Sequence, residues 1–506
     1  MSYPLIKLYR LFRIIIVYRI DQLILPKNRC ISPWLFWLYP FQTYKIKKLT
    51  PQERMVEAIV AMGPIFVKFA QILSSRFDML PADIAQSLAQ LQDKVPPFPF
   101  DEAKSILESH YKKPLSSIFS SFEKIPLGSA SLAQVYGACL LDGSEVAVKI
   151  LRPDIIQHVN KDLSLLRYIA ERIDRYHPNR HLIRVMDVIE SFEKSCHTEC
   201  DLRNEAGNYS YMRTLFEGSN DLYIPKVYWQ YSTANILIVE RIYGIPVANQ
   251  AQLLDTNIHV TKLARKNIEI FFKQVFEHNF FHGDLHPGNL FVDYSKTHDP
   301  MFIAVDFGIV GCLSKQDQYY LAENIISFLN RDYARVVDLH IESGWVAHDT
   351  SREDMICAIR AVGEPVYNRP LEEIQCAKLL GHLLQIARQH GMIVQPQLLL
   401  LQKNLLHAES LSRRLDPSIN LWHIARPFML QKSFKVPLTK SLYKLIDNIP
   451  EWLNHLANQP MHRSAQAVKP LAQVYATPPG KTRLKISGVI LALIAIFAVI
   501  QYDFFF

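Results

Sequence analysis

Two short polar motifs that lie close together in the chain constrain its fold more than any other feature. The first is His-Gly-Asp-Leu-His-Pro-Gly-Asn at 282–289, and the second is Asp-Phe-Gly at 306–308. Asp284 and Asn289 are five residues apart, and Asp306 follows Asn289 by seventeen. In Mg-nucleotide chemistry one carboxylate faces the acceptor, while an amide and a second carboxylate hold Mg²⁺ against the phosphates. Apolar runs flank both motifs and predict short buried strands that carry these polar groups at their ends.

A cation for the phosphates is offered by Lys149, at the end of a Val-Ala-Val-Lys run. Residues 134–150 form two apolar stretches joined at Asp142-Gly143, which is a strong tight-turn signal and predicts a hairpin. Lys149 would lie on the second strand and reach the α- and β-phosphates as a point charge. The alternative is a surface lysine at a strand end.

Upstream of this hairpin, residues 126–134 occupy the place of a phosphate-covering loop. A typical protein kinase has three glycines here, whereas this chain has Gly128 followed by Ala130 and Ala133. We therefore expect a stiffer and bulkier loop, with altered nucleotide selectivity or poor phosphotransfer to large acceptors. The candidate nucleotide-binding residues of this region are Leu127, Gly128, Ser129, Ala130, Ser131, Ala133, Val135 and Lys149.

A long helix is predicted over 185–216, because the stretch lacks proline and carries apolar residues at helical spacing. It offers two glutamates, Glu199 and Glu205, as partners for Lys149, and the spacing alone does not choose between them. Further along, residues 235–241 are typical of the last strand of a small lobe and its hinge. Backbone groups near Glu240 would meet the adenine there.

Taken together, these motifs resemble the UbiB family of atypical kinase-like proteins, which is associated with ubiquinone biosynthesis. The most specific signal is Gly-Pro-Ile-Phe-Val-Lys-Phe-Ala-Gln at 63–71, which looks like the family's Lys-x-Gly-Gln signature with Ala70 in place of the glycine. Glu199-x-Asp201 resembles a second signature, and the later motifs follow in the family's order. A stretch at 403–409 also looks familiar. The resemblance covers roughly residues 10–460.

The resemblance implies a role for each matching residue. Lys68 and Gln71 would belong to a helical N-terminal extension packed over the nucleotide site, which Glu199 and Asp201 would contact. Lys149 and Glu205 would form the phosphate-side ion pair. With Asp284, the residues Lys68 and Gln71 are the candidate catalytic residues, and the candidate metal ligands are Asn289 and Asp306. ATP (or ADP) and Mg²⁺ are the implied cofactors. Without the resemblance, Lys68 and Gln71 would be a solvated face of an amphipathic helix.

The implied extension would fill the place where a protein substrate docks on ordinary kinases. It therefore favours ATP hydrolysis coupled to work on a lipid or partner over phosphorylation of proteins in trans. After Asp306-Phe-Gly there is no Ala-Pro-Glu, so we do not expect activation-loop phosphorylation.

The composition allows a large core and argues against nucleic acid as a partner. The chain has 506 residues, of which 49% are hydrophobic, and its formal net charge is +8. This modest excess of positive charge suits binding to an anionic membrane surface or to a nucleotide. There is no long Lys/Arg run and no nucleic-acid motif. Seven scattered cysteines without a Cys-x-x-Cys pair fit a reducing cytosol.

The C-terminal segment predicts a membrane anchor. Residues 486–502 carry no charge and follow Lys481, Arg483 and Lys485. A membrane span needs about 20 apolar residues, and about 17 is the lower limit. The flanking bases place the start of the segment on the cytoplasmic side. We expect a single C-terminal transmembrane helix in a bacterial inner (cytoplasmic) membrane, with the bulk facing the cytoplasm. The alternative is a buried helix or an oligomer contact.

The expected architecture is an α+β, two-lobed protein-kinase-like fold, rich in helix, with an N-terminal helical extension and the C-terminal transmembrane helix. The predicted parts are a basic, apolar, membrane-touching lead at 1–50, the helical extension at 51–120, a kinase-like N-lobe at 121–250, a helical C-lobe at 251–450, a linker at 456–485 and the anchor at 486–506.

The leading functional hypothesis is a membrane-associated, Mg-ATP-dependent atypical kinase or ATPase that supports ubiquinone biosynthesis. Its expected partners are membrane lipids and polyprenylated quinone precursors, with quinone-biosynthesis enzymes as further candidates. One alternative is a small-molecule phosphotransferase of the aminoglycoside or choline kinase type, which shares the two catalytic motifs but lacks the Lys68 extension. Another is a non-enzymatic scaffold that is switched by nucleotide.

Overall fold

The computed structural model describes residues 49–433, apart from 75–86, 89–96, 177–184, 257, 296, 347–349, 368–374, 391 and 393–394, together with a few positions between 11 and 20. The predicted linker at 456–485 and the predicted anchor at 486–506 lie outside the described residues, as does most of the lead at 1–50. None of the helices in the described part of the chain combines the length and the apolar character that crossing a bilayer requires.

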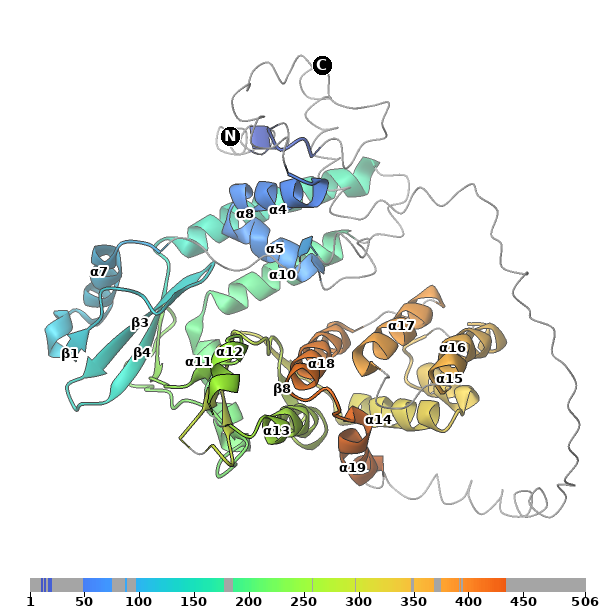
Figure 1. Ribbon diagram of the computed structural model, residues 1–506. Helices are drawn as coiled ribbons and strands as arrows, with labels where there is room; N and C mark the ends of the chain where they lie inside the picture. Colours follow the sequence, from blue (N-terminus) through green and yellow to red (C-terminus); the bar gives the residue numbers. More distant parts are fainter. Residues whose placement is uncertain are drawn as a thin grey trace, which may run out of the picture.

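A five-stranded antiparallel sheet forms the smaller lobe (Figure 1). Its strands are β1 (Phe119–Phe122), β2 (Gly128–Ser129), β3 (Ala133–Leu140), β4 (Glu145–Leu151) and β6 (Ile236–Glu240). The strand order is β1-β3-β4-β6, and β2 pairs with β3 off this path. The predicted hairpin is confirmed, because β3 and β4 pair antiparallel. The predicted last strand is confirmed as well, since β6 pairs with β4.

The turn between β3 and β4 lies at the residues that predicted it. Gly143 has a φ of 87°, in the left-handed region that side chains disfavour, and Asp142 Oδ1 accepts a hydrogen bond from the Ser144 amide at 2.9 Å. Beyond the turn, alternate residues of β4 point to opposite faces of the sheet. Val148 is fully buried against α7 (Phe100–Tyr111) and its neighbours, so the next residue, Lys149, faces the other side.

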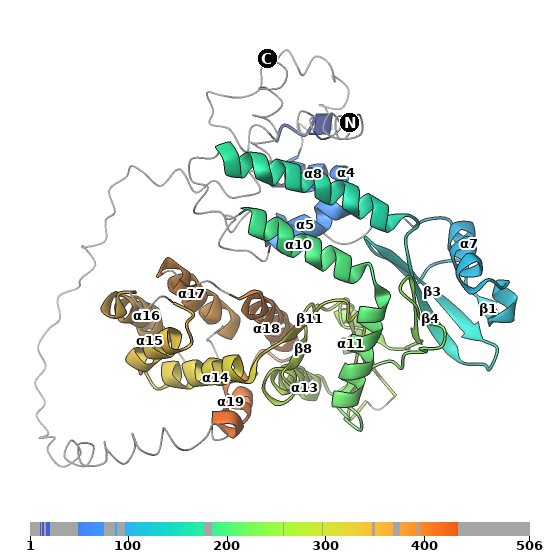
Figure 2. The same ribbon diagram turned by 180° about the vertical axis from the view of Figure 1, so that it is seen from behind.

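A layer of long helices lies above the lobe that carries the sheet (Figures 1 and 2). It consists of α4 (Pro51–Met62), α5 (Pro64–Ser74), α8 (Ile155–Tyr176) and α10 (Val185–Glu199). Helix α4 begins with a capping box in which Thr50 and Glu53 bond each other's backbone amides. Helix α5 packs on α10, where the rings of Phe69 and Phe192 lie 5.0 Å apart between centroids. These contacts join the N-terminal helices to α10, which belongs to a helical insertion between β4 and β6 of the smaller lobe.

The prediction of one continuous helix over 185–216 is wrong. Helix α10 ends at Glu199, and a second helix, α11, spans Leu202–Leu215. Between them Asp201 adopts an extended conformation, with φ −123° and ψ 97°, and its side chain accepts a hydrogen bond from the Arg203 amide. An aspartate at this position stabilises the start of a new helix better than the continuation of an old one. The chain therefore bends between the two glutamates.

Short strands carry both polar motifs into the larger lobe, as the sequence predicted. Strand β8 (Phe280–His282) pairs with β11 (Val310–Cys312), and β9 (Leu290–Asp293) pairs with β10 (Met301–Ala304). Two further strands, β5 (Leu222–Tyr223) and β7 (Ile245–Pro246), extend the sheet to the order β5-β10-β9-β7.

Helices make up the rest of the larger lobe (Figure 1). They are α12 (Gln250–Asp255), α13 (Val260–Phe272), α14 (Lys315–Leu329), α15 (Tyr333–Glu342), α16 (Arg352–Tyr367), α17 (Cys376–Gln389), α18 (Pro396–Leu415) and α19 (Leu421–Ser433). Helix α13 continues into a single π-helical turn, η3 (Lys273–Glu277). In this turn the carbonyls of Val275 and Phe276 accept hydrogen bonds from the Gln318 side chain, at 2.8 and 2.7 Å. The chain is thus a mixed α and β, two-lobed, kinase-like structure.

Candidate nucleotide site

Lys149 lies at the centre of a three-residue charge cluster between the lobes. Its Nζ is 2.8 and 2.9 Å from the two carboxylate oxygens of Glu205, on α11. The same Nζ is 3.0 Å from Oδ1 of Asp306, which follows β10. The structure therefore answers the question that the sequence left open, because Glu205 and not Glu199 pairs with Lys149.

The three groups of this cluster shift one another's ionisation. Burial by itself lowers the pKa of Lys149, but the carboxylates of Asp306 and Glu205 raise it overall. The Lys149 ammonium holds the pKa of Asp306 well below its usual range against the effect of burial. Burial raises the pKa of Glu205 to about 7, although Lys149 acts in the opposite direction. One ammonium facing two carboxylates thus leaves Asp306 firmly ionised and Glu205 able to take up a proton.

Helix α11 also fixes the backbone of the Asp-Phe-Gly motif. Asp306 has a φ of 64°, a left-handed conformation that is uncommon for a residue with a side chain. Its amide donates to the Tyr209 hydroxyl at 2.7 Å. The Asn208 amide donates to the carbonyl of Phe307 at 2.9 Å, and the rings of Tyr209 and Phe307 lie 4.6 Å apart. These contacts hold the Asp306 carboxylate toward Lys149.

The motif at 282–289 is hydrogen-bonded to the residues that flank Asp-Phe-Gly on both sides. The Val305 amide donates to the carbonyl of Asn289 at 3.0 Å, and the Gly283 amide donates to the carbonyl of Ile309 at 2.8 Å. A Cβ on Gly283 would lie 2.6 Å from Ile309 Cγ2, so only glycine permits this approach. The two motifs, which are close in the sequence, are therefore held close together in space by bonds to Val305 and Ile309.

His282 links the candidate catalytic loop, residues 282–289, to the strand end that carries Asp306. Its ring is 1% exposed and lies 3.2 Å from the Val305 carbonyl through Nε2, which must therefore carry the proton. The other ring nitrogen, Nδ1, accepts a hydrogen bond from the Asp284 amide at 3.0 Å. Burial lowers the pKa of His282 and keeps it neutral. The residue thus orients Asp284 and is not itself a proton donor to a ligand.

Helix α18 holds the catalytic loop from the far side. Lys403 Nζ is 2.7 Å from Asp284 Oδ1. Next to it, the buried Asn404 side chain accepts from the Leu285 amide at 3.1 Å and donates to the His282 carbonyl. Burial raises the pKa of Asp284, but the charge and hydrogen bond of Lys403, together with His286 and His282, outweigh burial, and the pKa is lowered overall. Sequence reasoning did not assign these two roles, although the stretch at 403–409 did look familiar.

The predicted phosphate-covering loop is a tight β2–β3 hairpin. The Leu127 amide donates to the Val135 carbonyl at 2.8 Å, and the Ala130 amide donates to the Ala133 carbonyl at 2.9 Å. Arg152 bonds the Ala130 carbonyl and the Ser129 hydroxyl, at 3.1 and 2.8 Å. These four hydrogen bonds hold the loop between β2 and β3. Among the predicted nucleotide contacts, Ser131 and Ala133 are buried, whereas Leu127, Gly128, Ser129, Ala130 and Val135 are at least partly exposed.

Glu240 ends β6, where the predicted hinge begins. Its carboxylate accepts hydrogen bonds from the Tyr223 hydroxyl at 2.6 Å and from the Lys226 amide at 3.1 Å. Its own amide donates to the Lys226 carbonyl. The side chain is therefore engaged in joining β6 to the segment after β5.

The N-terminal extension meets the insertion through an ion pair. Lys68, on α5, is 7% exposed and pairs with Glu199 at the end of α10. Gln71 follows one turn later on the same helix face. Asp201 bonds the backbone and guanidinium of Arg203. The contact between the extension and Glu199 is confirmed, and Lys68 does not lie on a solvated face.

Comparison with known proteins assigns the family. Residues 90–340 match the ABC1 atypical kinase-like domain, and residues 359–420 match the UbiB helical domain. A protein of Marinobacter nauticus named "Probable protein kinase UbiB" is 44% identical over 460 residues, which are 90% of this chain and 84% of that protein. A Pseudomonas fluorescens protein of the same name is 41% identical over 483 residues, 94% of this chain and 90% of its own. The chain belongs to the UbiB family.

The structural likeness to a solved protein is more distant. The complex of Rv3197 with erythromycin from Mycobacterium tuberculosis covers 69% of this chain at 21% identity, with a TM-score of 0.47. The match to the UbiB helical domain includes α18, which carries Lys403 and Asn404. This domain therefore contacts the catalytic loop directly.

The side chains of this UbiB site fit a nucleotide with Mg²⁺. Asp306 offers an ionised carboxylate, and Asn289 bonds the Asp284 carbonyl through its amide nitrogen, at 3.2 Å, which leaves the amide oxygen for a cation. Hard cations such as Mg²⁺ take oxygen ligands. No group of three or more His, Cys, Asp and Glu side chains in the described part of the chain could hold a metal by itself. The remaining ligands would come from phosphates and water.

Proposed function

We propose that this UbiB protein is a membrane-associated atypical kinase or ATPase that uses Mg-ATP to support ubiquinone biosynthesis. The observation that carries this proposal is the cluster of Lys149, Glu205 and Asp306, set beside a catalytic loop that is hydrogen-bonded to the residues flanking Asp306-Phe-Gly. It combines a phosphate-side cation, Lys149, with an ionised carboxylate, Asp306, that could hold a metal.

Each residue of the cluster has a defined part in nucleotide binding. Lys149 would contact the α- and β-phosphates, and Glu205 would keep its ammonium in place. Asp306 and Asn289 would hold Mg²⁺, which neutralises charge on the phosphates when bound. Because Asp306 pairs with Lys149 in this structure, a metal ion would compete with Lys149 for the carboxylate, and the phosphates would compete with Asp306 for the ammonium. Asp284, oriented by His282 and Lys403, would face the group that accepts the phosphoryl or an attacking water.

The low pKa of Asp284 limits its strength as a base. A carboxylate that is stabilised in its ionised form by Lys403 takes up a proton reluctantly. This property suits an aspartate that orients an acceptor or a water molecule. Together with the Lys68–Glu199 contact, which holds the N-terminal extension in place, it supports ATP hydrolysis over transfer to large protein acceptors.

The proposals for the substrate and for the location of the protein rest on its sequence. The relatives are named "Probable protein kinase UbiB", and the association with ubiquinone biosynthesis follows from the family resemblance. The uncharged C-terminal segment at 486–502 would anchor the protein in a bacterial inner membrane, where very apolar polyprenylated precursors reside. We propose that the protein acts on such precursors or presents them to other enzymes of the pathway.

The deciding experiment replaces the chromosomal gene in the source bacterium with the Asp306→Asn variant and measures the quinone profile. Loss of ubiquinone with accumulation of an early prenylated intermediate is expected. Asp354→Asn is a matched control, because Asp354 is exposed in the first turn of α16. A normal profile in Asp306→Asn cells would separate the metal site from quinone assembly and would turn attention to small soluble acceptors.

A further inference from the structure

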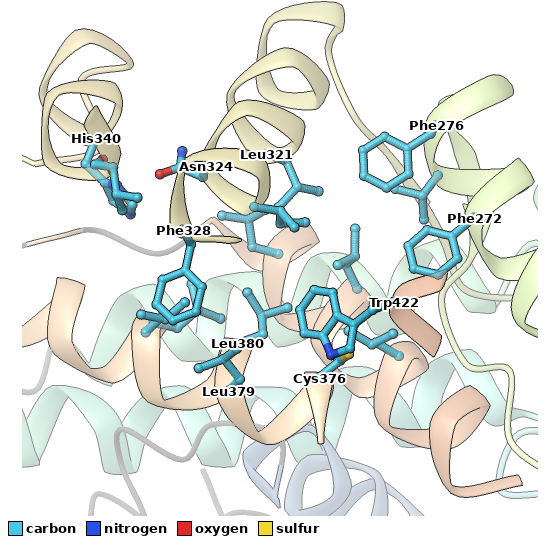
Figure 3. A pocket seen from close by; sticks show the side chains of 18 of the residues that line it. Phe272, Phe276, Leu321, Asn324, Phe328, His340, Cys376, Leu379, Leu380 and Trp422 are labelled. Atoms are coloured by element: carbon cyan, nitrogen blue, oxygen red, sulfur yellow. The ribbon is translucent and has the colours of Figure 1, made fainter. Parts of the chain in front are cut away.

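An apolar cavity of about 100 Å³ lies among the helices of the larger lobe (Figure 3). Its wall is formed by α13 with its π turn and by α14 to α19, and no lining residue carries a formal charge. The rings of Phe272, Phe276, Phe328 and Trp422 face this space together with leucines such as Leu380. A cavity walled in this way stays dry, because a water molecule needs several polar partners.

The few polar groups in the wall are neutral. Burial lowers the pKa of His340, whose Nδ1 lies 2.8 Å from the Val336 carbonyl. Burial raises the pKa of the Cys376 thiol well above its usual value. Two further polar atoms, Asn324 Oδ1 and Trp422 Nε1, are buried without a hydrogen-bond partner among the described residues. A core shaped only for stability avoids such unpaired atoms and fills such spaces.

The elements that line this cavity also hold the catalytic loop. On α18, Leu401 and Leu405 face the cavity, while Lys403 and Asn404, on another face of the same helix, bond the catalytic loop. The π turn also contacts both the cavity and the loop. Val275 and Phe276 line the cavity, and the Gln274 side chain accepts a hydrogen bond from the His282 amide at 2.9 Å. Isolated π turns occur frequently at functional sites. A change in the cavity therefore reaches the catalytic loop through two separate elements.

We propose that this cavity binds the hydrocarbon end of a lipid chain, and that its occupancy alters ATP turnover through α18 and the π turn. The engineered cavity that admits benzene or xenon measures about 150 Å³, so the present space suits the terminal carbons of a chain. Isoprenoid and acyl chains share this chemistry. The effect on turnover rests on the proposed ATPase function, whereas binding in the cavity does not.

The test uses the full-length protein and two photoreactive probes, a farnesyl alcohol and a palmitic acid, each with a diazirine at the far end of its chain. Labelled peptides are mapped by mass spectrometry, and ATP turnover is measured with and without each probe. Leu380→Phe and Leu383→Phe place a ring in the cavity. Leu406→Phe is the matched control, because Leu406 lies on α18 but is 44% exposed and outside the cavity lining.

The proposal expects labelling of the helices at 376–389 and 396–415 in the wild type and in Leu406→Phe. In the two filled variants labelling should fall by about ten-fold or more, because the added ring takes the space of the chain end. The probe should change the wild-type turnover several-fold and leave the turnover of the filled variants unaltered. Labelling by the farnesyl probe alone would assign an isoprenoid source, and labelling by palmitate alone an acyl source.

Labelling that is spread over the surface, or that is equal in the filled variants and the wild type, would overturn binding in the cavity. Cavity labelling without any change in wild-type turnover would overturn the link to the catalytic loop. A wild-type protein that hydrolyses no ATP under any condition would instead contradict the proposed function, and the labelling would still decide the occupancy of the cavity. If both phenylalanine variants fail to fold, competition by unlabelled farnesol for the labelled peptides decides the same point.

Discussion

The candidate site contains two lysine–aspartate pairs that are similar in chemistry and different in construction. Lys149 Nζ lies 3.0 Å from Asp306 Oδ1, and Lys403 Nζ lies 2.7 Å from Asp284 Oδ1. The first pair joins a strand of the smaller lobe to the end of a strand in the larger lobe, and Glu205 shares its lysine. The second pair lies within the larger lobe, where α18 supports a loop.

The difference between the pairs assigns them different parts in a reaction cycle. The Lys149–Asp306 pair connects the lobes across the place of the nucleotide, so a bound metal must displace or rearrange it. The Lys403–Asp284 pair does not cross that space and can persist while a nucleotide binds. We therefore expect the first pair to govern turnover directly and the second to position its aspartate.

The largest effect is expected from Asp306→Asn. Loss of this carboxylate should lower ATP turnover by about 10³-fold, on the scale of removing a principal electrostatic contributor to a transition state. Nucleotide binding, followed by thermal shift, should persist, because Lys149 and Glu205 remain. Turnover within ten-fold of the wild type would make the Lys149–Asp306 pair merely a structural contact between the lobes.

The next effect, on stability, comes from Asn404→Leu. This change leaves the buried Leu285 amide and the His282 carbonyl without a partner, and should lower the free energy of unfolding by about 2–4 kcal/mol. Urea denaturation measures it. Ser410→Leu serves as the control, because Ser410 is exposed on the same helix. If Asn404→Leu costs no more stability than Ser410→Leu, the two bonds of Asn404 do not support the loop.

Lys403→Met tests whether the second pair positions its aspartate. Turnover should fall by about 10- to 100-fold, and Lys403→Arg should restore part of it. Removal of the lysine charge also raises the pKa of Asp284 from its lowered value. Activity that requires the ionised carboxylate should therefore be lost at a higher pH on the acid side of the pH–rate profile. An unchanged acid limb with reduced turnover would contradict an electrostatic role.

The smallest effect concerns His407, one turn beyond Lys403 on α18. Burial, reinforced by the charge of Lys403, lowers its pKa from 6.5 to about 4. As the pH falls from 6.5 to 4 the unfolded chain takes up this proton before the folded protein, so stability present above pH 6.5 is lost in that window. Between pH 7 and 6 the loss amounts to about 0.7 kcal/mol. In a plot of unfolding free energy against pH, His407→Gln should make this part of the curve flatter. An unaltered slope would refute the contribution of His407.

The sequence predicted local features well, since each depends on neighbouring residues. Asp142-Gly143 located the hairpin, and the apolar runs beside Asp284 and Asp306 located the strands that carry them. It failed where a single residue outweighed a periodic pattern, because Asp201 starts a new helix inside an otherwise helical stretch. The support of Asp284 by Lys403 joins residues 119 positions apart, and no local spacing shows such a contact. The apolar cavity likewise arises from helices that only the tertiary fold brings together.

The bend at Asp201 sets a length that the chain has to keep. Glu199 closes one helix and faces Lys68, and six residues later Glu205, in the first turn of the next helix, faces Lys149. One residue inserted after Asn204 would advance the rest of α11 by about 100° around its axis, given 3.6 residues per turn. Glu205 would then move away from Lys149, and Tyr209 would move away from Asp306 at the same time. The interval between the two glutamates should therefore tolerate substitution far better than any change of length.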